Sequence, residues 1–161
     1  MEEALTREPW LREQDLCVDP ALAQVLFSLQ QVREDIVKYT KGLADVPASP
    51  LGFHLRHLAG STDRLTTYLA GKPLDPAQLA ELSQEKTPGL TLQELLTAIE
   101  SSLQKAEAAI RDLNPDDFGE PRYIGRQRIR TTAIGLAIHI AEHAQRHTGQ
   151  IIPLCHAVNL P

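Results

Sequence analysis

Apolar residues recur at intervals of three and four along four long segments of this 161-residue chain. The segments cover about residues 20–42, 51–71, 91–113 and 131–154, and prolines or glycines bound most of them. Such spacing places the apolar side chains on one face of an α-helix, and no stretch of comparable length alternates with the period of a strand. The pattern therefore predicts an all-α fold, a four-helix bundle whose apolar faces meet in one core.

Capping residues support the starts of three of these helices. Asp19 and Ser49 each precede a proline, the usual order of an N-cap followed by the first helical position. Thr91 and Glu94 have the spacing of a capping box. The packing positions of the fourth helix are expected at Ile134, Ile138, Ala141, Ile151 and Leu154.

The connections between the helices differ in length. Residues 72–90 form a long connection between the second and third helices, with a short helix predicted around 77–82. A connection of this length lets the two helices run parallel. Residues 114–130 are polar and rich in turn residues, and residues 1–18 are expected to form an N-terminal arm or short helix. The length of the chain suits a single domain, 1–161.

The composition argues against several classes of function. The formal net charge is -5, whereas nucleic-acid binding usually needs a basic face. The apolar runs are shorter than the roughly 20 residues of a membrane span, and the acidic N-terminus lacks the apolar segment of a signal peptide. We therefore expect a cytoplasmic protein that binds neither nucleic acid nor membrane. Cys17 and Cys155 lie far apart in no C-x-x-C motif and are expected to be reduced thiols.

Histidines are spaced at every fourth residue in the last predicted helix, at His139, His143 and His147. Four residues of an α-helix turn the side chain by about 40° and advance it by about 6 Å, so two successive imidazoles can bind one cation. His54 and His57 lie in the second predicted helix. Our hypothesis is a divalent metal site between two helices, with a third ligand from the second helix; the alternative is that the histidines only pack.

The metal cannot be identified from histidines alone, because imidazole binds several divalent ions. Zinc and nickel are favoured, and iron, manganese and copper also fit such a site. Three neutral imidazoles would leave the full charge of the ion and at least one coordination position for water or a small-molecule substrate. A metal ion in this setting acidifies bound water or stabilises a bound thiolate.

Two motifs together resemble those of the DinB-like family, also called the DinB/YfiT superfamily. They read S-P-L-G-F-H-L-R-H-L-A-G-S at 49–61 and H-I-A-E-H-A-Q-R-H-T-G-Q-I at 139–151. The resemblance extends over about residues 20–155. It implies a four-helix bundle, often dimeric, in which three histidines hold one divalent metal ion.

Matched by motif, the resemblance assigns the ligands to His57 of the second helix and to His143 and His147 of the fourth. Family members of known activity are thiol-dependent transferases and related metal enzymes. The resemblance therefore implies a metal-dependent transferase that acts on a small thiol, and it leads us to expect a homodimer. The first and third helices could present the dimer surface.

Further residues are candidates for contacting the ligands or lining a substrate pocket: His54, His139, Glu142, Gln150 and Arg126. Gln150 could hydrogen-bond a ligating histidine and fix its tautomer. Glu142 could act as a base if it reaches the pocket, or it could be a surface carboxylate. Arg126 belongs to a group of arginines that is either solvated or binds an anionic substrate at the mouth of the metal pocket.

Two other functions stay open. The segment from His139 to His143 reads H-x-x-E-H, the pattern of the inverted zinc peptidases, and so suggests a metal-dependent hydrolase. That reading is less favoured, because only 18 residues follow His143 and none of them is acidic. The second alternative is a non-catalytic, metal-stabilised module for binding or dimerisation.

Overall fold

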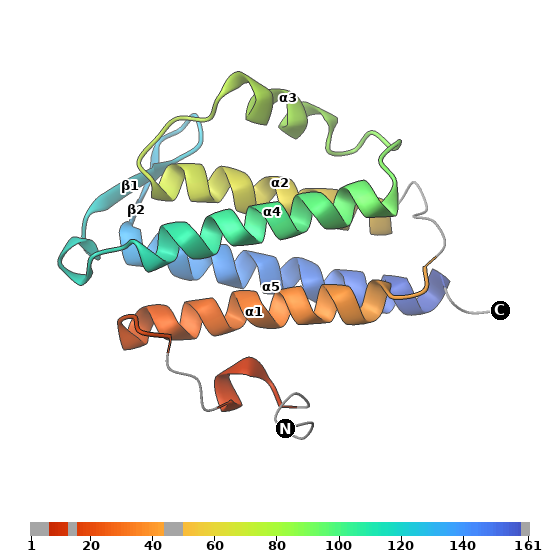
Figure 1. The fold of residues 1–161 in the computed structure, drawn as a ribbon. Helices are drawn as coiled ribbons and strands as arrows, with labels where there is room; N and C mark the ends of the chain where they lie inside the picture. The colour runs from red at the N-terminus through yellow and green to blue at the C-terminus, as the bar shows by residue number, and fades with distance from the viewer. Residues whose placement is uncertain (1–6, 13–15, 44–49, 159–161) are drawn as a thin grey trace.

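A computed structural model of the chain describes residues 7–12, 16–43 and 50–158 (Figure 1). In this part of the chain, five α-helices and one β-hairpin form, and four of the helices are long. The long helices are α1 (Pro20–Thr40), α2 (Leu51–Leu69), α4 (Leu92–Arg111) and α5 (Ala133–Val158). They pack into the four-helix bundle that the apolar spacing predicts, so the all-α prediction is confirmed.

The arrangement of the bundle follows from its long connection. Helices α2 and α4 run in the same direction, and α1 and α5 run in the opposite one (Figure 1). The predicted parallel course of the second and third long helices is therefore confirmed. Arg33 of α1 joins two turns of α4, through Glu100 at 2.8 Å and Glu107 at 2.7 Å.

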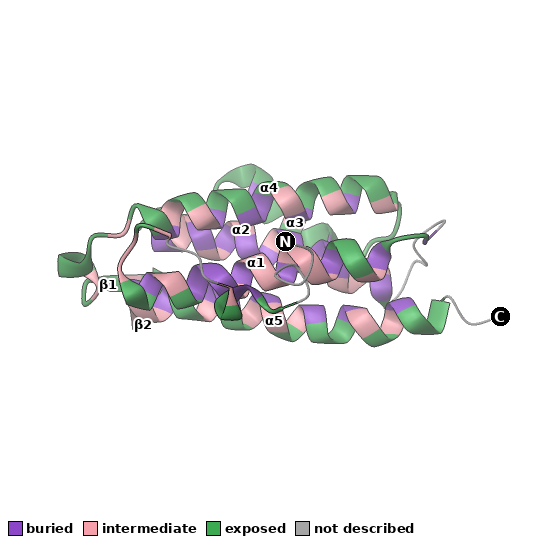
Figure 2. Ribbon diagram, turned by 60° about the horizontal axis from the view of Figure 1, so that its bottom comes forward, coloured by how far each residue is buried: buried purple, intermediate pink, exposed green. Residues whose placement is uncertain are grey.

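The core lies between the four long helices, whose buried faces point inward (Figure 2). Its largest fully buried side chains are Leu22, Leu29, Leu51, Leu55, Leu58, Leu69, Ile99, Leu103, Ile110, Leu136, Ile140 and Ile151. The predicted packing position of Ile138 is wrong, since this residue is 52% exposed. The buried face of α5 passes through Leu136, Ala137 and Ile140, so Ile138 points to the opposite side.

The helix starts agree with the capping residues where the structure describes them. The Asp19 side chain accepts a hydrogen bond from the Ala21 amide, and Thr91 and Glu94 form both bonds of a capping box. Ser49 lies outside the described residues, and α2 begins at Leu51.

The long connection contains α3 (Pro76–Gln84), which covers the predicted short helix and lies along α2 (Figure 1). Buried Arg56 of α2 makes two bonds to Glu81, at 2.6 and 3.0 Å, and a third to the Thr87 carbonyl at 2.8 Å. Glu85, the residue that follows α3 directly, accepts a hydrogen bond from buried Arg64 of α2. These charge-assisted bonds hold the connection against α2 and bring Glu85 to the middle of that helix, next to Gly60.

A β-hairpin follows α4, whereas the sequence predicts only polar turns for residues 114–130. Its strands are β1 (Pro121–Ile124) and β2 (Ile129–Thr132), paired antiparallel with Pro121 opposite Thr132. β-branched and aromatic residues favour these strands, but four residues are too few for a clear period of two. Gly125, with φ +68°, begins the loop in a conformation that suits glycine.

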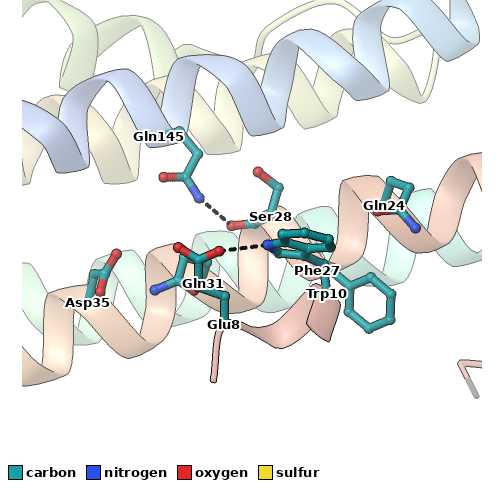
Figure 3. Close-up of a pocket in the computed structure, with 8 residues that line it drawn as sticks. All are labelled: Glu8, Trp10, Gln24, Phe27, Ser28, Gln31, Asp35 and Gln145. Carbon is teal, nitrogen blue, oxygen red and sulfur yellow. Dashed lines mark hydrogen bonds between the residues drawn. The ribbon is translucent and has the colours of Figure 1, made fainter. Parts of the chain in front are cut away.

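The described part of the predicted N-terminal arm lies on α1. Arg12 bonds both carboxylate oxygens of Glu34, at 2.5 and 2.6 Å, and η2 (Pro9–Leu11) precedes it. A hollow of about 360 Å³ lies between the arm, α1 and α5 (Figure 3). At its edge the indole N–H of Trp10 donates a hydrogen bond to the Glu8 carboxylate. The side-chain amide of Gln145, on α5, donates a hydrogen bond to a backbone carbonyl of α1.

Within the described residues, no helix combines the length and the apolar character that crossing a bilayer requires.

Candidate metal centre

Three histidines from two helices meet inside the bundle. His57 projects from α2, and His143 and His147 project from α5, one turn apart. Each offers a ring nitrogen, and the three nitrogens lie within 4.8 Å of one another. The ring centroids are 5.3 Å apart for His57 and His143, 4.4 Å for His57 and His147, and 4.7 Å for His143 and His147. These three residues are called the histidine cluster below.

The spacing of the cluster suits a divalent ion. The two Nε2 atoms of His57 and His143 are 3.2 Å apart. Two nitrogens that bind one tetrahedral zinc ion at about 2.0–2.1 Å are separated by roughly 3.4 Å. The structure therefore already holds these nitrogens at nearly the separation that shared coordination requires.

Glu85 orients the ring of His57. The Nδ1 atom of His57 lies 2.8 Å from one carboxylate oxygen of Glu85, and Arg64 donates to the other. Because an ionised carboxylate can only accept, the proton of His57 is held at Nδ1 and Nε2 is left with its lone pair. Ligating histidines in metalloproteins typically have this kind of partner, which fixes both tautomer and ring orientation.

The charge of Glu85 is stabilised by its two partners. Its side chain is only 8% exposed, and this burial alone would raise its pKa. Hydrogen bonds from His57 and Arg64 outweigh the burial and lower the pKa of Glu85 below its ordinary value. Gly60 leaves room for this pair, since a Cβ atom there would lie 2.8 Å from Nη1 of Arg64.

His54 contacts the cluster through His147. Their Nδ1 atoms are 3.1 Å apart, so one of them carries the shared proton and the other accepts it. When His147 carries that proton at Nδ1, its Nε2 atom keeps a lone pair and can act as a ligand. Phe53 stacks on the ring of His57, with centroids 5.5 Å apart and an angle of 22° between the planes. The neighbouring residues therefore position two of the three rings.

The two α5 histidines of the cluster, His143 and His147, are neutral at physiological pH. Burial, followed by repulsion from His57, lowers the pKa of His143 and of His147 to about 4. Neutral imidazole is the form that binds metals. The Nδ1 atom of His143 is also buried and has no hydrogen-bonding partner among the described residues. Leaving a buried polar atom unsatisfied costs about 1–3 kcal/mol, and an ion bound at Nε2 of the same ring would not satisfy this Nδ1 atom.

The other two polar residues of the H-x-x-E-H motif, His139 and Glu142, lie outside the cluster. The Glu142 side chain is 57% exposed and bonds Arg146 at 2.5 Å and His139 at 3.4 Å. This exposure makes Glu142 a surface carboxylate, and hydrogen bonds from His139 and Arg146 lower its pKa. The His139 ring lies 5.7 Å from that of His143 and does not join the three converging nitrogens. Of the two alternatives for Glu142, its position suits the surface carboxylate rather than a base in the pocket.

Two further candidate residues lie away from the cluster. Gln150 is exposed near the end of α5 and makes no hydrogen bond to the histidines in the described part of the chain. Arg126 lies in the loop of the hairpin and lines a separate pocket with Tyr68 and Lys72, which contains none of the cluster residues. Burial raises the pKa of the Cys155 thiol, and this residue does not belong to the cluster.

Glu85 is the functional residue that sequence reasoning misses. It lies 28 residues from His57, in a connection without a periodic pattern, so no spacing rule links the two. The available signal is indirect. Arg56 and Arg64 are two turns apart on α2 and both are buried, and buried arginines require carboxylate partners, here from another segment.

The low pKa values predict that metal-free protein loses stability in acid. His143 and His147 titrate near 4 when folded and near 6.5 ordinarily, so the unfolded chain binds more protons between these pH values. The free energy of unfolding, measured with urea, should therefore fall as the pH is lowered from about 6.5 to 4. The double variant His143→Gln/His147→Gln should show a flatter dependence; an unchanged dependence would contradict the assignment.

Comparison with known proteins agrees with this geometry. A search of curated proteins gave no match. The sequence model of the DinB superfamily matches residues 2–151, which include α1, α2, α4 and all three residues of the histidine cluster. The chain therefore belongs to the DinB superfamily.

Proposed function

We propose that this protein binds one divalent metal ion through His57, His143 and His147. The observation that carries the proposal is the convergence of three imidazole nitrogens from two helices, one of them oriented by a buried carboxylate. Zinc and nickel are the favoured ions, and iron, manganese or copper would also suit such ligands. His54 and Glu85 would keep the rings in the orientation that ligation needs.

We further propose that the protein is a transferase that acts on a small thiol. Membership of the DinB superfamily supports this activity through the thiol-dependent transferases that the family resemblance implies. A divalent ion at the cluster would supply Lewis acidity, which keeps a bound thiol deprotonated at neutral pH. The thiolate sulfur would form a bond to an electrophilic carbon of the second substrate, and the leaving group would depart with the electron pair.

The carboxylates around the cluster favour a transferase over a hydrolase. A hydrolase of the H-x-x-E-H type needs a glutamate that can take a proton from water. Glu142 lies on the surface, and Glu85 is already bonded to Arg64 and His57. A low-pKa thiolate nucleophile needs no such base. The same lack of an available base also suits the second candidate, a non-catalytic metal-stabilised binding module. The homodimer stays a prediction.

Metal retention tests the ligand set. Purified without a histidine tag, the protein should contain about one equivalent of divalent metal by elemental analysis. His57→Ala, His143→Ala and His147→Ala should each lose most of it, because two imidazoles alone bind weakly. His139→Ala is the matched control, since it removes a histidine of the same helix outside the cluster. Equal loss in all four variants would contradict the assignment.

The Glu85 carboxylate should increase the metal affinity of the histidine cluster through its bond to His57, although it is not itself a ligand. Glu85→Gln keeps the shape of the side chain but removes the charge that holds the proton at Nδ1 of His57. Zinc affinity, measured by competition with a chelating dye, should fall by about 10–100-fold. Glu81→Gln removes the equivalent partner of Arg56 but touches no histidine, so its zinc affinity should be unchanged. A similar loss of zinc affinity in both variants would contradict this role and indicate that Glu85 only stabilises the fold.

Transferase activity can be measured directly. Zinc- or nickel-loaded protein should accelerate the reaction of cysteine, glutathione or coenzyme A with 1-chloro-2,4-dinitrobenzene, followed by absorbance. His147→Ala should reduce the accelerated rate at least about tenfold, since the remaining cluster cannot hold the ion. Metal binding without acceleration for a broad set of thiols and electrophiles would favour the non-catalytic module.

A further inference from the structure

A second hollow lies at the hairpin end of the bundle, away from the histidine cluster. It has a volume of about 620 Å³, and its lining residues come from the end of α2, the start of the long connection, α3 and the β-hairpin. Figure 1 shows the hairpin beside the end of α2. Four cationic side chains line it, and we call it the basic pocket. They are Lys72, Arg122, Arg126 and Arg128.

The positive charge of the basic pocket is largely uncompensated. The whole chain is acidic, with a net charge of -5, yet no aspartate or glutamate lines this pocket. Arg122 contacts Glu120 at 3.3 Å, whereas Lys72, Arg126 and Arg128 make no ion pair with the described residues. Like charges gathered in one concave site repel each other and raise the local potential, so they attract an anion.

Two of the arginines are held in place before any ligand binds. The Arg122 side chain is 15% exposed, and its Nε atom donates to the Leu69 carbonyl at the end of α2, at 2.7 Å. The Arg128 guanidinium stacks on the Tyr123 ring, 4.5 Å from its centroid. Arg128 also has a φ of +50°, a conformation that costs a non-glycine residue about 1 kcal/mol or more. Retained strain of this kind is common at binding sites.

The remainder of the wall is mostly apolar. Tyr68, Pro73, Leu74, Leu79 and Pro121 contribute to it. Small-molecule sites usually occupy about 300–1,000 Å³ and combine an apolar wall with a few polar groups. Arginine guanidinium groups match phosphate oxygens with paired hydrogen bonds. The wall therefore suits a molecule with an apolar body and a phosphate group.

We propose that the basic pocket binds a small phosphate monoester with an aromatic or apolar body. The site is separate from the proposed metal centre, because no residue of the histidine cluster lines the pocket. The loop residues Arg126 and Arg128 contact the phosphate, while Tyr68 and the apolar residues contact the body of the ligand. This inference does not depend on the proposed transferase activity.

The probe for the test is 1-naphthyl phosphate, compared with 1-naphthol and inorganic phosphate by isothermal titration calorimetry. The combined ligand should bind at least about tenfold more tightly than either part alone, and its affinity should fall as salt is added. Equal affinity for the naphthol would show that the charges do not contribute, and no binding of the phosphate ester would likewise overturn the proposal.

Variants that each remove one positive charge test whether the probe binds in the basic pocket. Arg126→Ala and Lys72→Ala should each weaken binding about tenfold, the effect of losing one charged hydrogen bond. Arg130→Ala is the matched control, because it removes an exposed arginine of the same hairpin outside the pocket. If Arg130→Ala weakens binding of the probe equally, the effect comes from the overall charge of the protein, and the proposed site is wrong.

His147→Ala separates this site from the histidine cluster. Its affinity for 1-naphthyl phosphate should equal that of the unaltered protein, because His147 lies outside the pocket. If this variant fails to bind the probe while its circular dichroism spectrum is unchanged, the probe binds at the histidines and the proposal is wrong. Arg126 and Lys72 are exposed, so their loss should leave the fold intact.

Discussion

The buried carboxylate of Glu85 connects the fold of this protein to its histidine cluster. It accepts from Arg64 and from Nδ1 of His57, so one side chain both ties the long connection to α2 and sets the tautomer of a ring in the cluster. A buried charge is stable only when it is paired and fully hydrogen-bonded. The pair of Arg56 with Glu81 acts in the same way along the same connection, and together these bonds make α3 a fixed layer over α2.

The other two histidines of the cluster come from α5 and depend on their spacing of four residues along that helix. His143 and His147 are one turn apart, and the surrounding apolar packing keeps both rings neutral by lowering their pKa values to about 4. Two neutral rings from α5 and one oriented ring from α2 form a set that suits a divalent ion. The basic pocket at the hairpin is a separate feature, in which positive charge is concentrated without carboxylate partners.

Features with a local period could be predicted from the sequence. The four long helices, the capping box at Thr91 and the three histidines all follow from residues spaced three or four apart. The hairpin could not be predicted in this way, because each of its strands has only four residues. Glu85 and Arg126 could not be placed, since their positions depend on how the connections cross the bundle rather than on neighbouring residues. Spacing misassigned Ile138, an apolar residue that lies on the solvent-exposed face of α5.

Anomalous diffraction from crystals of the zinc-loaded protein, recorded at the zinc absorption edge, tests the central claim most directly. We predict one strong peak within about 2.0–2.1 Å of a ring nitrogen from each of His57, His143 and His147, with Glu85 still bonded to His57. A peak elsewhere, or a zinc ion bound without His57, would contradict the account.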